Sequence, residues 1–298
     1  MTTRTPVPTT ATLTVGDVAI TALLDVDLHF PVPVDQVFPG VGDEEWAAHR
    51  ARYPEAFSPA GGWRYAVTCY LLRTSGRCVL VDTGCGASSL AFPSFIGTGG
   101  AARGAIDRTA GGPGDVDTVV ITHVHPDHVG GVLAPDDPPR PAFPRARYLL
   151  PARDWDAWRR PEVQEAFPVP YVGDTVAPLV EMGVVDLVEG ERAVAPGLTL
   201  IPTPGHTPGS STLLVRSAGE RAALVGDMWL HPAQVTDPAI RCGFDMDPGR
   251  AAATRAEWVQ RIEQEGMTVG ACHFPEPFGQ LVRLEGRHHW MPVTRWAD

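Results

Sequence analysis

The sequence predicts a mixed fold of the α/β (α+β) class, with two β-rich halves and helices on their outer faces. Strand-like segments come in two batches, and helical segments follow each batch, which differs from a strictly alternating parallel sheet. Hydrophobic residues make up 44% and charged residues 20% of the 298 residues, as in a globular protein with a substantial core. Because we find no long linker and no short-period repeat, we expect one domain over residues 1–298.

The first batch of elements follows a flexible lead-in expected over residues 1–10. Apolar patterns bounded by Gly, Pro and Ser predict strands over residues 11–15, 18–30, 65–73, 77–81, 116–121 and 147–150. Thr74-Ser75-Gly76 predicts a hairpin turn between the strands over 65–73 and 77–81. Helices are expected from Asp43, where acidic residues suit a helix N-terminus, and over residues 152–166 and 175–182. Residues 86–115 predict a loop around a short helix near 101–108.

The second batch lies closer together along the chain. Apolar runs predict strands over residues 198–201, 211–215 and 222–225. The longest helical pattern covers residues 247–265, and a strand over 268–271 follows it. This second group of strands therefore carries its own outer helix.

Composition excludes several functions. The net charge of -11 and the pI of about 5.3 disfavour nucleic-acid binding, which needs clustered basic side chains. The chain has no lysine and no asparagine, so a Schiff-base lysine, a P-loop lysine and a Cys-His-Asn triad are impossible. Five cysteines without a CxxC pair fit a reduced, cytoplasmic protein. We see no signal peptide and no membrane span, so we expect no membrane partner.

A dense cluster of metal-ligand side chains follows the predicted strand 116–121. It comprises His123, His125, Asp127 and His128. On an extended segment His123 and His125 point the same way, whereas Asp127 and His128 follow a proline and can face a second point. Surface histidines on a polar loop are the alternative, but four such ligands directly after a strand indicate a metal, and they suit zinc, iron or manganese.

Three more candidate ligands lie at the ends of predicted strands. They are His206 in a Pro- and Gly-rich turn, Asp227 after strand 222–225 and His273 after strand 268–271. Taken singly, each has an ordinary alternative: a turn histidine, a helix N-cap aspartate and a histidine at the edge of the core. Together with the cluster they make seven candidate ligands at C-terminal strand ends, where α/β proteins place their sites.

These segments resemble the metallo-β-lactamase superfamily of metallohydrolases. The matching pieces occur in the family's order: Val81-Asp82-Thr83-Gly84, the HxHxDH run 123–128, Gly205-His206-Thr207-Pro208-Gly209, Gly226-Asp227 and Cys272-His273-Phe274. The resemblance implies a four-layer αβ/βα sandwich, with two facing mixed β-sheets, helices on the outer faces and the site at one edge.

The resemblance also implies two divalent metal ions. His123, His125 and His206 would bind the first ion, and Asp127, His128 and His273 the second, with Asp227 bridging them. Asp82 would steady a ligand through hydrogen bonds. Zn²⁺ is the first expectation, and the same ligands accept Fe, Mn or Co.

Metal chemistry then gives the expected mechanism. Two ions roughly 3.5–4 Å apart share a water and lower its pKa towards about 7, and the resulting hydroxide attacks a carbonyl or phosphoryl centre. Asp127 is the expected proton acceptor. The predicted reaction is hydrolysis of an ester-type bond (a lactone, ester or aryl phosphotriester) in a small, largely apolar substrate.

Within the superfamily the layout resembles the lactonase and organophosphate-hydrolase-like branch, through the segments 226–232 and 273–275. Lactonases of this branch typically carry a tyrosine a few residues after the bridging aspartate, whereas this chain has Met228-Trp229-Leu230-His231. His231 is either a substitute proton donor or a structural histidine. Trp229, Phe244 and Phe274 are the expected pocket residues, chosen from a wider set that also holds Phe30, Phe38 and Trp290.

Other functions stay open at this point. One is a mono-iron dioxygenase that oxidises a thiol or persulfide, using two histidines and one aspartate. Others are a catalytically silent metal-binding scaffold and a thioesterase or cyclase that acts on a carrier-bound acyl or polyketide chain. Cys85 and Cys272 either approach the metals or pack as small buried residues. The oligomeric state is open, with a homodimer as one option.

Overall fold

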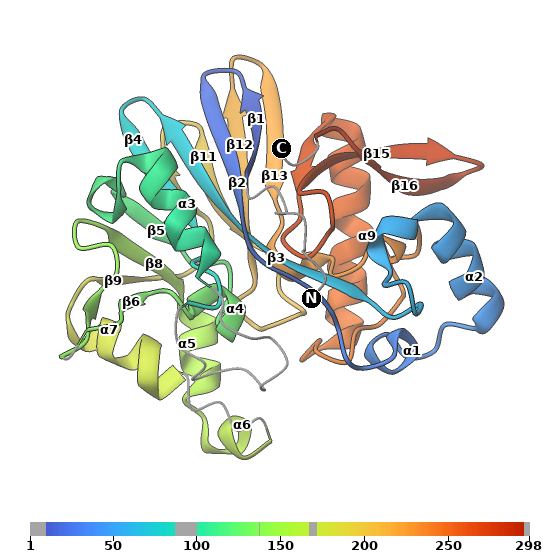
Figure 1. Ribbon diagram of the computed structural model, residues 1–298, viewed down its shortest axis with the longest axis horizontal. Coiled ribbons are helices and arrows are strands. Elements are labelled where there is room, and N and C mark those ends of the chain that lie inside the picture. Colours follow the sequence, from blue (N-terminus) through green and yellow to red (C-terminus); the bar gives the residue numbers. More distant parts are fainter. Residues whose placement is uncertain (1–9, 87–99, 137, 167–171, 295–298) are drawn as a thin grey trace, which may run out of the picture.

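Two large β-sheets face each other in the computed structural model, which describes residues 10–86, 100–136, 138–166 and 172–294 (Figure 1). Most of the expected lead-in 1–10 lies outside the described residues, as does the 87–99 part of the expected loop. Each large sheet has seven strands and contains both parallel and antiparallel pairs.

The first sheet is built from the N-terminal half of the chain. In spatial order its strands are β1 (Thr10–Val15), β2 (Val18–His29), β3 (Arg64–Thr74), β4 (Arg77–Val81), β5 (Thr118–Val120), β8 (Arg147–Pro151) and β9 (Val185–Val188). Antiparallel hairpins form its first part, and β4, β5, β8 and β9 pair in parallel. Nearly every residue of β3 is buried because both of its faces are covered.

The second sheet is built from the C-terminal half. Its strands are β10 (Arg192–Ala195), β11 (Leu198–Pro202), β12 (Ser211–Ser217), β13 (Glu220–Leu224), β14 (Thr268–Gly270), β15 (Phe278–Leu284) and β16 (Arg287–Pro292). Only β13 and β14 pair in parallel, and the other neighbours are antiparallel. A separate two-stranded ribbon joins β6 (Leu133–Ala134) and β7 (Arg140–Pro141).

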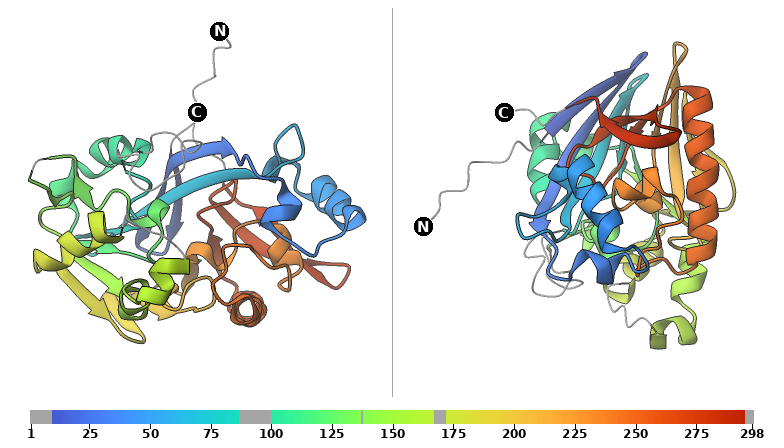
Figure 2. Two further views of the ribbon diagram at one scale, coloured as in Figure 1. Left: turned by 90° about the horizontal axis from the view of Figure 1, so that it is seen from below. Right: turned by 90° about the vertical axis from the view of Figure 1, so that its right-hand side faces the viewer.

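Helices lie on the outer faces of the two sheets and at the edges of the sandwich. They are α1 (Val34–Val37), α2 (Asp43–Arg52), α3 (Ala101–Ala110), α4 (Pro126–Val129), α5 (Ala152–Trp158), α6 (Pro161–Ala166), α7 (Ala177–Glu181), α8 (Ala233–Thr236) and α9 (Pro248–Glu265). Seen from the side, α3 and α9 lie on opposite faces with both sheets between them (Figure 2). The predicted four-layer αβ/βα sandwich is thereby confirmed. No helix of the described ranges is long and apolar enough to cross a lipid bilayer.

Three buried clusters hold these layers together. Ile20, Leu72 and Leu213 belong to the cluster between the sheets, where both inner faces are apolar. A second cluster lies under α3, α5 and α7. In a third, Trp258 and Ile262 of α9, one helical turn apart, pack against the second sheet. Full burial of such side chains stabilises the fold by about 1.5–3 kcal/mol each.

Most predicted elements are confirmed within a residue or two, with two corrections in the helices. The helix expected over 152–166 is two helices, α5 and α6, because Pro161 lacks an N–H and disfavours a helical residue before it. The helix expected over 175–182 is α7, which a π-helical turn over Val172–Val176 precedes. Strands β9, β10, β15 and β16 were not expected from the sequence. β10, β15 and β16 carry exposed polar side chains, and no residue of β9 is fully buried.

Candidate metal centre

The ends of neighbouring strands bring the predicted ligands to one edge of the sandwich. Strand β5 leads into the histidine cluster, and its parallel neighbour β4 ends at Asp82. In the second sheet β11 leads into the turn of His206, and the parallel neighbours β13 and β14 lead to Asp227 and His273. Since parallel strands end at the same edge of a sheet, residues far apart in sequence meet there.

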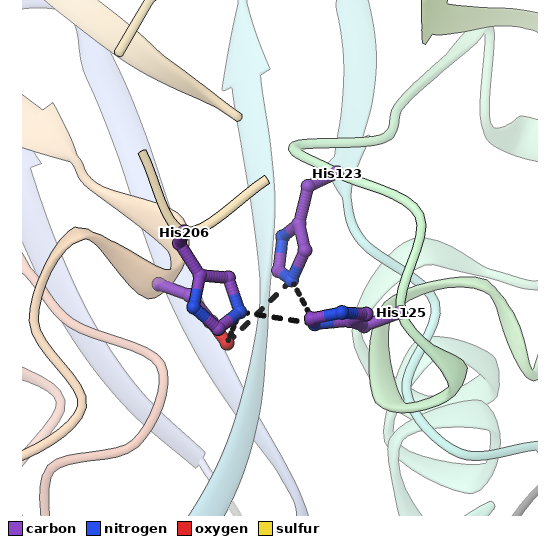
Figure 3. A group of neighbouring side chains, drawn as sticks. His123, His125 and His206 are labelled. Carbon is purple, nitrogen blue, oxygen red and sulfur yellow. Dashed lines mark hydrogen bonds and ion pairs between the residues drawn. The ribbon is translucent and has the colours of Figure 1, made fainter. Parts of the chain in front are cut away.

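The first group of ligand atoms consists of His123, His125, His206 and one oxygen of Asp227 (Figure 3). The Nδ1 atom of His125 lies 3.0 Å from Nε2 of His123 and 2.9 Å from Nε2 of His206. Oδ2 of Asp227 lies 3.2 Å from Nε2 of His206 and 3.5 Å from Nε2 of His123. All of these side chains are buried except that of His125, which is half-buried.

The second group lies on the other side of the same aspartate. Oδ1 of Asp227 is 3.2 Å from Nε2 of His128 and 3.0 Å from Nε2 of His273. Oδ2 of Asp127 is 3.3 Å and 3.4 Å from the same two nitrogens. Oδ2 of Asp227 also lies 3.1 Å from Nε2 of His273. The Asp227 carboxylate therefore lies between the two groups and contacts both, as a bridging ligand would.

These donor sets fit divalent metal ions. Three ring nitrogens of the first group face one another, and Nε2 of His128 is buried without a hydrogen-bond partner among the described residues. Burial, reinforced by the neighbouring imidazoles, lowers the pKa of His123 well below its usual value and that of His125 to about 3. Both imidazoles are thus neutral, which is the form that binds metal. Although burial opposes the charge of His128, His206 and His273, nearby carboxylates raise the pKa of all three, so these imidazoles must lose a proton when an ion binds.

Asp82, the residue expected to steady a ligand, lies beside His128. Oδ2 of Asp82 lies 2.8 Å from Nδ1 of His128 and accepts the hydroxyl hydrogen of Thr122 at 2.8 Å. Its Oδ1 accepts the backbone N–H of Thr122 at 2.8 Å. Asp82 has φ of 59°, in the left-handed region, which shows that the turn after β4 is held in a costly conformation.

His206 has a support that sequence reasoning missed. Oδ1 of Asp245 lies 3.2 Å from Nδ1 of His206, and Oδ2 lies 3.2 Å from Nη1 of the fully buried Arg255 on α9. Although burial opposes ionisation of Asp245, its bond to His206 and the charge of Arg255 hold its pKa below the usual value. The carboxylate can therefore fix the tautomer and orientation of His206. The only sequence signal is a charged residue inside an otherwise apolar helix face.

Asp154 ties the two ligand loops together, and sequence reasoning missed it too. Its buried carboxylate accepts the N–H of Val124 at 2.8 Å, the hydroxyl of Thr207 at 2.9 Å and the N–H of Gly209 at 2.5 Å. A Cβ on Gly209 would lie 2.7 Å from Asp154, so only glycine fits there. Burial raises the pKa of Asp154 to about 6 despite these hydrogen bonds.

Tyr65 is a third residue that the sequence did not reveal. Its hydroxyl donates to Oδ2 of Asp127 at 2.6 Å, and its ring stacks on His273 with centroids 4.6 Å apart. Burial, together with the nearby charge of Asp127, raises the pKa of this phenol well above its usual value. The hydroxyl therefore stays protonated and acts as a donor.

The two cysteines near the site are thiols. Sγ of Cys272 lies among the ligand atoms of the second group, with His128, Asp227 and His273. It is 3.0 Å from Oδ1 of Asp227 and 3.2 Å from the carbonyl oxygen of Gly226. Burial, with the charge of Asp227 added for Cys272 and that of Asp127 for Cys85, raises both thiol pKa values well above normal. All five cysteines of the chain are buried and free.

His231 lies in an aromatic box. Its ring centroid is 4.8 Å from that of Phe57, 5.6 Å from that of Phe38 and 5.7 Å from that of Trp46. Nδ1 accepts the backbone N–H of Ala233 at 3.1 Å, and the side chain is completely buried. This placement favours the structural alternative for His231.

The expected pocket residues separate into two kinds. Trp229 and Phe274 are completely buried in the core cluster beneath α9, which favours a packing role for both. Phe244 is 46% exposed, and its ring lies 6.0 Å from that of Phe30. Phe30 in turn lies 5.5 Å from the ring of Tyr65, so an aromatic row runs from the surface to the second ligand group.

Comparison with known proteins identifies the family. A model of the metallo-beta-lactamase superfamily matches residues 62–273, more than half of the chain. The N-acyl homoserine lactonase AiiB of Agrobacterium fabrum is 29% identical over 241 residues, which cover 73% of this chain and 82% of that protein. An N-acyl homoserine lactonase of Bacillus cereus is 26% identical over 190 residues, which cover 59% of this chain and 68% of that protein.

Solved structures share the whole architecture. The hydrolase AbOPH of the beta lactamase superfamily superposes with a TM-score of 0.84 at 24% identity, covering 99% of this chain and 100% of that chain. AidC, a dizinc quorum-quenching lactonase, superposes with a TM-score of 0.79 at 18% identity, covering 97% and 98%. By fold and by family match, this chain belongs to the metallo-beta-lactamase superfamily and is a metal-dependent hydrolase of that fold.

Proposed function

We propose that this protein is a dinuclear metal hydrolase that opens or cleaves an ester-type bond of a small, largely apolar molecule, with a lactone as the first substrate to test. The observation that carries the proposal is Asp227, whose carboxylate lies between the two groups of ligands and belongs to both. The intact second group supports two ions in preference to the single iron of a dioxygenase. The N-acyl homoserine lactonases among its relatives support a lactone substrate.

The proposed ligands divide by position. His123, His125 and His206 would hold one ion and Asp127, His128 and His273 the other, while Asp227 would serve both. When bound, two divalent ions would lower the pKa of a water towards about 7 and polarise the oxygen of the scissile bond. Zinc is the proposed metal, and the same side chains accept iron, manganese or cobalt.

In this proposal, side chains near the metal site accept the proton of the attacking water and set the orientation of the ligands. Burial disfavours the charge of Asp127, but His128 and His273 hold its pKa below the usual range, so it is a carboxylate, the form that a metal ligand requires. Asp127 is also the proposed acceptor for the proton of an attacking water. Asp82 and Asp245 keep Nδ1 of His128 and His206 occupied, which leaves their Nε2 atoms for metal. His231 takes a structural role in this proposal.

The substrate class follows from the surroundings of the second group. Phe244, the exposed end of the aromatic row that leads through Phe30 to Tyr65, offers apolar surface to an acyl or aryl group of the substrate. The net charge of -11 disfavours a polyanionic substrate. An uncharged lactone or ester suits both features.

The test combines metal analysis with a substrate panel. Protein purified without chelator should contain about two equivalents of zinc, or of a mixed pair, by plasma mass spectrometry. That protein should hydrolyse members of a panel of lactones, aryl esters and phosphotriesters, and chelation should abolish the rate. One equivalent of iron, with oxygen uptake in the presence of thiols or persulfides, would overturn the proposal.

A further inference from the structure

Tyr65 meets the second ligand group at one particular atom. Its hydroxyl donates to Oδ2 of Asp127 at 2.6 Å, and a carboxylate can only accept, so the direction of this hydrogen bond is fixed. The same Oδ2 faces Nε2 of His128 at 3.3 Å and Nε2 of His273 at 3.4 Å. The phenol therefore binds the carboxylate oxygen that both imidazoles of this group approach.

Tyr65 and its neighbour also hold His273. The rings of Tyr65 and His273 stack at 4.6 Å between centroids with an interplanar angle of 21°. The backbone carbonyl of Ala66 lies 2.6 Å from Nδ1 of His273, which directs Nε2 away from the strand and towards Asp227. Two successive residues of β3 thus fix the carboxylate and the imidazole of one ligand group.

The first group has no such link to Tyr65. Within the described part of the chain, Tyr65 makes no hydrogen bond or ring contact with His123, His125 or His206. Tyr65 and Ala66 pair with β2, and strand β3 is almost completely buried. Its side chains consequently have little freedom to follow a ligand that moves.

We propose that Tyr65 is a positioning residue that sets the affinity of the second ligand group for its divalent ion, a role that rests on the two-metal function proposed above. Its hydrogen bond restricts the rotation of the Asp127 carboxylate, and its ring fixes the plane of His273. Both side chains are then ordered before an ion arrives, so binding does not have to meet the entropy cost of ordering them. Tyr65 acts through these two residues and not on the reacting bond.

The test is a zinc titration of the metal-free protein, competed against a chromophoric chelator. Tyr65→Phe removes the hydroxyl and keeps the ring. We expect one of the two zinc dissociation constants to rise about 10-fold to 100-fold, while the other stays as in the wild type. Tyr65→Leu removes the ring as well and should raise the same dissociation constant further. With Co²⁺ in place of zinc, the absorption bands of one ion should change and those of the other should not.

Tyr53→Phe is the matched control. The hydroxyl of Tyr53 is also bonded in the interior, to Thr236 at 2.5 Å, but none of its partners is a proposed ligand. It should alter thermal stability without altering either zinc constant. Circular dichroism of the metal-free variants establishes that each is folded before titration, and Tyr65→Leu serves in place of Tyr65→Phe if the latter is not.

The outcomes separate this proposal from the one it rests on. A wild type that binds two ions and a folded Tyr65 variant with unchanged constants would overturn the role of Tyr65 and leave the hydrolase proposal standing. A wild type that binds one ion would overturn both. In an Asp127→Ala background the Tyr65→Phe change should have a much smaller effect, and an undiminished effect there would also contradict a role through Asp127.

Discussion

The carboxylate of Asp245 lies 3.2 Å from the imidazole of His206, Oδ1 to Nδ1, with both side chains buried. This contact leaves Nε2 of His206 to face the first ligand group. Because Asp245 also contacts Arg255 on α9, the orientation of a candidate ligand depends on a helix in the outer layer of the sandwich. The first prediction follows from that chain of contacts.

Asp245→Ala should lower the affinity of the first ligand group for its metal ion and destabilise the fold. It leaves the fully buried guanidinium of Arg255 without its charged partner, which costs about 3–5 kcal/mol. Urea unfolding of the metal-free protein and zinc titration measure the two effects. Asp186→Ala breaks an exposed ion pair with Arg147 and should cost less than about 1 kcal/mol. Equal losses in the two variants would contradict the prediction.

Asp227→Ala should remove the shared ligand. Each group then loses an oxygen, so metal content should fall below two equivalents per chain and hydrolysis should collapse. Plasma mass spectrometry and an ester assay give both values. Full metal loading with a normal rate would refute the bridging role.

Asp154→Asn should disturb both ligand loops although Asp154 touches no proposed ligand through a hydrogen bond. The amide offers one oxygen where the carboxylate uses two, so at least one of three buried donors loses its acceptor, at a cost of about 1–3 kcal/mol. Thermal unfolding of the metal-free protein measures this loss. Asp136→Asn, in an exposed pair with Arg140, is the control and should change little.

The pH dependence of stability should reveal the environment of His231. Burial, helped by His49, lowers its pKa to about 3 in the folded protein, against about 6.5 in an unfolded chain. As pH falls, the unfolded chain takes the proton first. The stability present above pH 6.5 is therefore lost as pH falls towards 3, by up to about 1.4 kcal/mol per pH unit from this group.

His231→Asn removes that titration while keeping an acceptor for the N–H of Ala233. The stability difference between wild type and variant should shift by this slope between pH 6.5 and 5, as measured by urea unfolding. The metal content and turnover of the variant distinguish the two roles that the sequence allows for His231, a proton donor and a structural histidine. An unchanged rate supports the structural role, whereas a reduced rate with full metal would identify a proton donor.

Phe244→Ala should raise KM for apolar substrates with little change in metal content. It removes the exposed end of the aromatic row, and the lost contact should weaken binding by about 1–3 kcal/mol. Leu187→Ala is a matched control because Leu187 is also 46% exposed but lies on β9, away from the row. Steady-state kinetics on acyl chains of increasing length give the comparison, and a KM that does not change would remove Phe244 from the pocket.

How much the sequence could predict depended on whether the signal was local. The strand before His123 and the turn around His206 carry dense local patterns, and the structure brings these residues together. The residues that hydrogen-bond to the ligands or their loops have no such local pattern around them. Asp154, Asp245 and Tyr65 reach the site only through tertiary contacts, and each looks ordinary in its own segment.

Two of the strands that escaped prediction, β15 and β16, share a physical cause. β15 and β16 form a hairpin at the edge of the second sheet, so one face is solvated and their apolar pattern is diluted by Arg, Gln and His. Their turn, Glu285-Gly286, has φ of 50° and 81°, which Asn-Gly would have signalled more clearly. The aromatic box around His231 likewise depends on residues that come from three separate segments.

The proposed ligands come from both sheets, and this has a consequence for how the chain matures. Neither half alone offers a complete set for either ion, since His125 needs His206 from the other sheet and His128 needs His273. His273 is also the last of these residues to be synthesised. Metal binding therefore comes at the end of folding, and a bound pair of ions would show that the two halves have packed together correctly.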